Sequence, residues 1–196
     1  MLKLSKTQAQ KAGGFTIIEL IVVITIISLL SLLMFANYNQ GNKKLSLELQ
    51  AYKIASDIRQ AQENSLGAVQ VPSFSYSQVC GYGIYFDVGS NSYALFADTN
   101  PAPSNCGYLY DSSDQKLATI YANSDFFIKS ITAYNNNIPT SVSKIGIVFI
   151  PPNPATKIKS GGSGDDYSQA VIVVGSASAP DTMAVIINKA GLIYVQ

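Results

Sequence analysis

The chain is 196 residues long, contains no histidine and one arginine, and carries a formal net charge of +1 from 13 basic and 12 acidic side chains. The lack of histidine excludes His-activated nucleophiles and His-ligated zinc sites. The nearly balanced charge is not typical of nucleic-acid-binding proteins.

The first predicted element is a basic leader over residues 1–14. It contains three lysines and no acidic residue, and the small residues Ala12, Gly13 and Gly14 stand at its end. A conventional secretory signal has its small-residue cleavage site after the apolar region. Here the small residues precede that region, so a cut after Gly14 would leave the apolar segment on the mature chain.

The next element, over residues 15–36, is predicted to be a transmembrane helix. Its sequence is FTIIELIVVITIISLLSLLMFA, in which Glu19 is the only charged residue. A helix of this length spans about 33 Å, enough to cross the hydrocarbon core of a bilayer. The basic residues before it favour an orientation with the N-terminus in the cytoplasm.

Glu19 is a candidate functional residue because a carboxylate inside a membrane segment is costly. If the chain is cut after Gly14, the new α-amino group of Phe15 lies four residues from Glu19, about one helical turn away. That amine, in the same subunit or in a neighbour, could neutralise the carboxylate. The alternative is that Glu19 lies near the interface and reaches water.

The segment KAGGFTIIELIVVITIISLL resembles the leader and N-terminal helix of the type IV pilin superfamily, which includes pilus subunits and the pseudopilins of type II secretion. The resemblance implies that a prepilin peptidase cuts after Gly14 and N-methylates Phe15, with Glu19 as the fifth mature residue. It also implies assembly with other pilins or pseudopilins on an inner-membrane platform. The helix-kinking proline common in major pilins is missing, and Ala36 stands near that point.

Residues 37–68 are predicted to form a second, amphipathic half of the helix. The polar stretch 37–43 contains Gly41, which is expected to loosen the helix there. Beyond it a helical stripe is formed by Leu47, Ala51, Ile54, Ile58 and Ala61, widened by Leu45, Leu49 and Tyr52. We expect this stripe to pack on the globular domain; the alternative is a coiled-coil partner.

Residues 69–196 are predicted to form an antiparallel β-domain of seven or eight strands, because short apolar runs alternate with turn signals. The loops are expected at 151–154 and 160–166. The expected fold class is therefore α+β, a long N-terminal helix followed by a β-sandwich-like domain. This order resembles the minor pseudopilin whose globular part is two antiparallel sheets, and the tail INKAGLIYV is similar to its final hairpin. The apolar runs lie at 82–86, 93–96, 117–121, 126–133, 145–150, 170–174, 183–187 and 192–195.

The two cysteines, Cys80 and Cys106, are expected to form a disulfide. A pair of cysteines in an exported domain is typically oxidised. Cys80 precedes the first strand of a predicted hairpin and Cys106 follows the second, so antiparallel pairing brings them together. A bond closing this loop would stabilise the domain by about 3 kcal/mol. The alternative is two free thiols.

Two kinds of ligand site are not favoured by the sequence. Asp98, Asn100, Asp111 and Asp114 supply oxygen atoms for calcium, but prolines interrupt them and no closing glutamate follows, so turn-forming roles are preferred. No cofactor or metal is expected. A DNA-binding patch over four lysines is offset by nearby acidic residues; the lysines are Lys144, Lys157, Lys159 and Lys189, and the acidic residues are Asp165, Asp166 and Asp181.

The sequence does not predict an enzyme. A nucleophile elbow is missing, and no histidine is present to activate a serine. The interpretation is a structural, minor filament subunit, held in the bacterial cytoplasmic membrane as a single-pass protein with its β-domain outside the cytoplasm. The alternatives are a minor pilin with a DNA-uptake or adhesive surface and, less favoured, a membrane-anchored hydrolase.

Overall fold

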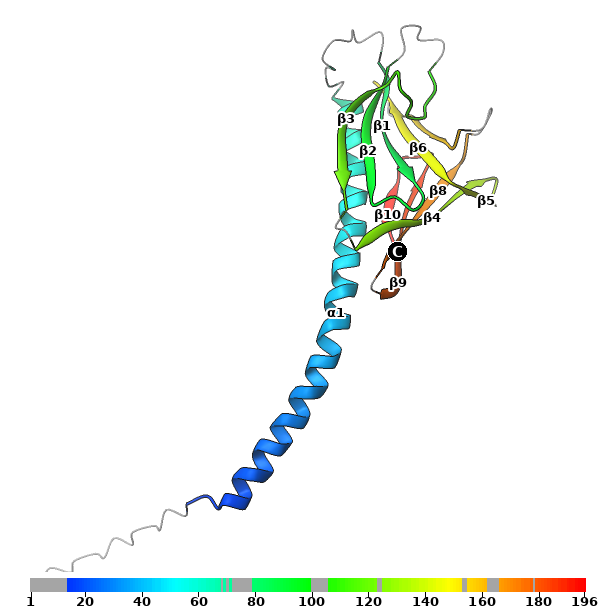
Figure 1. The fold of residues 1–196 in the computed structure, drawn as a ribbon. Coiled ribbons are helices and arrows are strands. Elements are labelled where there is room, and N and C mark those ends of the chain that lie inside the picture. Colours follow the sequence, from blue (N-terminus) through cyan, green and yellow to red (C-terminus); the bar gives the residue numbers. More distant parts are fainter. Residues whose placement is uncertain are drawn as a thin grey trace, which may run out of the picture. The chain divides into compact units, whose positions relative to one another are not determined.

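The computed structural model describes residues 14–67, 69, 71, 79–99, 106–122, 125–152, 155–161, 166–177 and 179–196, without the side chains of 35–40 and 179. The leader predicted over residues 1–14 therefore lies outside this description except for Gly14. The chain divides into two compact units, Met1–Gly41 and Asn42–Gln196. Its content of one long helix and two antiparallel sheets confirms the α+β class (Figure 1).

The helix α1 extends over Ile17–Leu66 and is continuous through Gly41. The prediction that residues 37–43 loosen the helix is therefore wrong: these residues are helical. A single interior glycine costs a helix only about 1 kcal/mol, which the long flanking turns outweigh.

The part of α1 in the second unit buries one narrow face. Leu47, Ala51, Ile54, Ile58 and Ala61 are at most 1% exposed, which confirms the predicted stripe and places it in the domain's own core. The prediction that three further residues widen this stripe is wrong. Leu45, Leu49 and Tyr52 are each more than half exposed.

The β-domain consists of two five-stranded antiparallel sheets. The first has the order β3-β2-β1-β6-β7, and the second has the order β10-β9-β8-β4-β5. The strands of the first sheet are β1 (Val79–Asp87), β2 (Ser92–Thr99), β3 (Gln115–Tyr121), β6 (Lys144–Ile150) and β7 (Ala155–Lys159). Those of the second are β4 (Phe126–Asn135), β5 (Ile138–Val142), β8 (Gln169–Ser176), β9 (Ala179–Asn188) and β10 (Ile193–Val195).

Two of these strands, β5 and β7, are not among the predicted apolar runs. β5 contains Pro139 and is exposed along nearly its whole length, as expected of an edge strand. It is joined to β4 by Asn136 and Asn137, whose φ angles of 48° and 66° form a two-residue hairpin turn. β7 is an edge strand of the first sheet and pairs with β6. Unlike β5 it has a buried face, formed by Thr156 and Ile158, and its two lysines alternate with these residues.

The C-terminal half of α1 packs against the inner faces of both sheets in one continuous core. Two polar contacts fix it there. The only arginine, Arg59, donates to the carbonyl oxygen of Ile193 in β10 at 3.1 Å. The Tyr93 hydroxyl in β2 donates to Asp57 at 2.5 Å, and burial raises the pKa of Tyr93, so this group remains a donor.

Candidate functional site

The helix α1 begins two residues after the predicted cleavage point. Gly14, Phe15 and Thr16 are not helical. The Thr16 carbonyl oxygen accepts the first helical hydrogen bond, from the Leu20 N–H at 3.2 Å, and its hydroxyl oxygen accepts the Glu19 N–H at 3.3 Å. Thr16 is therefore the N-cap, and Thr16 with Glu19 has the spacing of a capping box. We did not predict this role for Thr16, although its T-x-x-E pattern is visible in the sequence.

Glu19 occupies the first turn of α1, where a carboxylate interacts favourably with the positive end of the helix dipole. Phe15 is 83% exposed. Glu19 therefore stabilises the start of α1, in addition to the amine pairing that we expect after cleavage. Both roles place its charge at the N-terminal end of the apolar segment.

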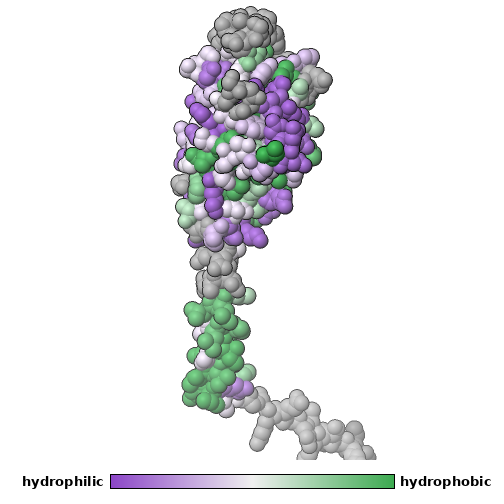
Figure 2. All heavy atoms as spheres, turned by 90° about the vertical axis from the view of Figure 1, so that its right-hand side faces the viewer, coloured by the Kyte–Doolittle hydropathy of each residue, from purple (hydrophilic) through white to green (hydrophobic). Residues whose placement is uncertain are grey.

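The apolar segment of α1 is long enough to span a membrane. Ile17–Met34 has a mean hydropathy of 2.8, and none of it is buried within the chain. At 1.5 Å per residue this stretch measures roughly 27 Å. Figure 2 shows the apolar side chains exposed on the surface of this segment. Such a surface needs a lipid or protein partner to shield it from water.

Three hydroxyl groups interrupt this apolar surface. Thr25, Ser28 and Ser31 each donate to the carbonyl oxygen four residues earlier, at 2.7, 2.7 and 2.8 Å. Their protons are satisfied within the helix, which is the expected arrangement in an apolar environment. The small side chains leave room for close helix–helix approach.

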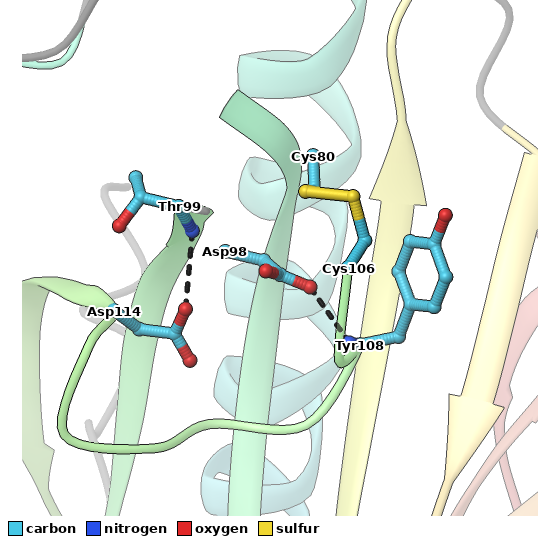
Figure 3. Close-up of a disulfide and its surroundings, with 6 residues drawn as sticks. All are labelled: Cys80, Asp98, Thr99, Cys106, Tyr108 and Asp114. Carbon is cyan, nitrogen blue, oxygen red and sulfur yellow. Dashed lines mark hydrogen bonds between the residues drawn. A yellow bond between two sulfur atoms is a disulfide. The ribbon is translucent and has the colours of Figure 1, made fainter. Parts of the chain in front are cut away.

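A disulfide joins Cys80 of β1 to Cys106, at a Cα–Cα distance of 5.8 Å (Figure 3). Next to it, the Asp98 carboxylate on β2 accepts the Tyr108 N–H at 2.7 Å. Tyr108 has a positive φ of 55°, and Asp98 is only 3% exposed. The segment after Cys106 is therefore fixed to the sheet by a covalent bond and by a buried carboxylate.

The other acidic residues of this region stabilise the backbone of a turn. Asp114 accepts the N–H groups of Thr99 and Asp111, at 3.1 and 2.8 Å, and Asp111 accepts the Ser113 N–H at 2.7 Å. These contacts are those of turn-forming Asx residues. Asn100, the remaining calcium candidate, lies outside the described residues. Within the described ranges, no three His, Cys, Asp or Glu residues are grouped so as to hold a metal ion.

Two of the four lysines considered for DNA binding are paired with one carboxylate. Asp166 accepts hydrogen bonds from Lys189 at 2.9 Å and from Lys157 at 3.3 Å. These lysines hold the pKa of Asp166 below its ordinary value, although partial burial opposes the effect. The pairing weakens the case for a free basic patch. Asp165 lies outside the described residues.

Asp98 is expected to make the stability of the domain depend on pH. Burial, with small contributions from Asp114 and Asp111, raises the pKa of Asp98 from 3.8 to about 6, against the opposing Tyr108 N–H. The folded chain therefore retains this proton at pH values where the unfolded chain has lost it. The resulting stabilisation is present below about pH 4 and is lost as pH rises through about 6; its upper limit is about 3 kcal/mol.

Substituting Asp98→Asn should remove this pH dependence. Between pH 4 and pH 7, the unfolding free energy of the wild type should fall by up to about 3 kcal/mol relative to that of Asp98→Asn. Urea unfolding of the full chain in detergent, followed by tyrosine circular dichroism, measures it. Asp181→Asn, at an exposed carboxylate, is the matched control. An equal difference at both pH values would contradict the prediction.

Comparison with known proteins identifies the N-terminal segment. Residues 10–35 match the family model described as the prokaryotic N-terminal methylation motif. The match includes Gly14, Phe15 and Glu19. It supports a type IV pilin-like protein, and the motif implies processing by a prepilin peptidase. No curated protein and no solved structure matches the chain.

Proposed function

We propose that the chain is a structural, minor subunit of a type IV pilus-like or type II secretion pseudopilus filament. The observation that carries this proposal is a methylation-motif helix whose apolar side chains are exposed along Ile17–Met34. A helix of this kind is stable in a bilayer before assembly and among similar helices afterwards.

In this proposal the chain has four functional parts. Residues 1–14 are the leader that prepilin peptidase removes, and residues 15–36 form the membrane-spanning and then filament-core helix. Residues 37–68 form the helical half that packs on the β-domain, and residues 69–196 form that domain. The basic leader favours a cytoplasmic N-terminus, so the β-domain lies outside the cytoplasm, joined to the cytoplasmic membrane by a single span.

The role of the protein is mechanical and involves no reaction by its own side chains. Assembly transfers the apolar helix from lipid to a bundle of helices of other pilins or pseudopilins, with the help of an inner-membrane platform. Glu19 then pairs with the amine that cleavage creates on Phe15 of a neighbour. Low dielectric strengthens this pair relative to one at a surface, although desolvation offsets part of the gain.

Cleavage between Gly14 and Phe15 is the direct test of this proposal. When the full chain is produced in cells with a prepilin peptidase, the intact mass should correspond to loss of residues 1–14 and gain of one methyl group on Phe15. Cells without the peptidase should retain the leader. A mature chain that begins near Asn37 would instead indicate an ordinary signal peptide and overturn the proposal.

A further inference from the structure

The first sheet has an apolar outer face that the core does not use. Phe96 of β2 and Val148 of β6 both pair with Gly83 of β1, and they alternate with neighbours that point into the core. Both side chains are nevertheless 0% exposed. Some other part of the chain must therefore cover them.

Part of that cover, over Phe96, is the segment Cys106–Tyr110, which we call the strap. The Tyr110 ring lies edge-on to Phe96, with centroids 5.3 Å apart. A Cβ added to Gly146 of β6 would lie 3.0 Å from the Tyr108 carbonyl oxygen and 3.1 Å from Leu109 Cδ1. The strap thus lies directly on the backbone of β6, so close that a Cβ at position 146 would displace it by a few tenths of an ångström.

The disulfide and several non-covalent contacts hold the strap. They include the Tyr108 N–H to Asp98, the Leu109 contacts with Gly146 and Gly161, and the packing of the Tyr110 ring against Phe96, Tyr85 and the Lys116 ammonium. The strap has no regular secondary structure, so ordering it costs backbone entropy without a ladder of hydrogen bonds in return. Without a covalent link, such a segment is expected to open locally.

We propose that the strap is an oxidation-dependent cover, closed over Phe96 only when Cys80 and Cys106 are joined. The two thiols lose two protons and two electrons to a protein disulfide of an oxidoreductase, which becomes the dithiol as the Cys80–Cys106 bond forms. In the reduced chain the strap opens and exposes an apolar sheet face, while the core between α1 and the inner sheet faces stays closed. Where in the cell oxidation occurs rests on the proposed function, which places the domain outside the cytoplasm.

Hydrogen exchange on the full chain in detergent micelles tests the separate opening of the strap. The oxidised wild type is compared with the chain reduced by a phosphine and with the double variant Cys80→Ser, Cys106→Ser. We expect the Tyr108 amide to exchange on the order of 100-fold faster in both forms that lack the disulfide, because the disulfide limits the loop entropy that the open segment gains. The amides of β8 and β9 should keep their protection. Retained protection at Tyr108 overturns the proposal, and so does equal loss of protection in β8 and β9.

A second variant disturbs the strap while both cysteines are kept. Gly146→Ala forces Tyr108 and Leu109 outward, whereas Gly107→Ala, within the strap, meets nothing closer than 3.8 Å and is the matched control. Because docking and oxidation are coupled, Gly146→Ala should shift the thiol–disulfide balance about tenfold toward the dithiol in a glutathione titration, and Gly107→Ala should not. Equal midpoints would overturn the coupling. Neither experiment needs a filament, so the proposed function can fail while this inference stands.

Discussion

Substituting Glu19→Leu is expected to leave the chain folded, cleaved and in the membrane, but to lower its entry into filaments by about tenfold or more. The leucine removes the carboxylate that pairs with the Phe15 amine of a neighbour. It therefore leaves that amine as an uncompensated charge in a low-dielectric helix bundle. Membrane retention should not suffer, since leucine is more favourable than glutamate in a bilayer. The measurement is the amount of variant that co-purifies with sheared filaments, relative to the amount in the membrane.

Two further variants separate the charge of Glu19 from its place beside the Thr16 cap. Glutamine can occupy the same position of a capping box but carries no charge, so Glu19→Gln should fail in assembly as the leucine variant does. Glu63→Leu makes the same change at an exposed carboxylate elsewhere on α1 and should assemble normally. If Glu19→Gln assembles at the wild-type level, the carboxylate acts as a helix cap and the amine-pairing mechanism is wrong.

Substituting Ile58→Ala is expected to lower the unfolding free energy of the β-domain unit by about 3 kcal/mol. Ile58 is 0% exposed on α1 and belongs to the core cluster that joins the helix to both sheets. Truncating a fully buried isoleucine removes its transfer free energy and leaves a cavity, for which typical losses are about 2–5 kcal/mol. Urea unfolding of the full chain in detergent, monitored by tyrosine circular dichroism, gives the value.

Leu49→Ala provides the matched comparison, because Leu49 lies on the same helix but is 61% exposed. Its loss should change the unfolding free energy by no more than about 0.5 kcal/mol. A large effect at Leu49 would show that the exposed flank of α1 is covered by another copy under the conditions used. A small effect at Ile58 would contradict the docking of this helical half in the core.

The amino-acid sequence alone determined the features that depend on local pattern. The leader, the apolar span and Glu19 form a motif over residues 10–35, which a family model also matches. The buried stripe from Leu47 to Ala61 follows from helical periodicity, because one face of an amphipathic helix must be shielded from water. The α+β class follows because, beyond this helix, the helical spacing of apolar residues gives way to short apolar runs separated by turn signals.

Only the tertiary structure decided features that depend on what lies opposite a residue. Leu45, Leu49 and Tyr52 are as apolar as the stripe beside them, but the sheets cover only a narrow face of α1. β5 and β7 carry weak strand signals, because edge strands need not be apolar on either face. Asp98 is buried, and the strap covers Phe96, through contacts between separate strands and a non-repetitive segment. Such contacts are set by distances in space, which periodicity along the chain does not encode.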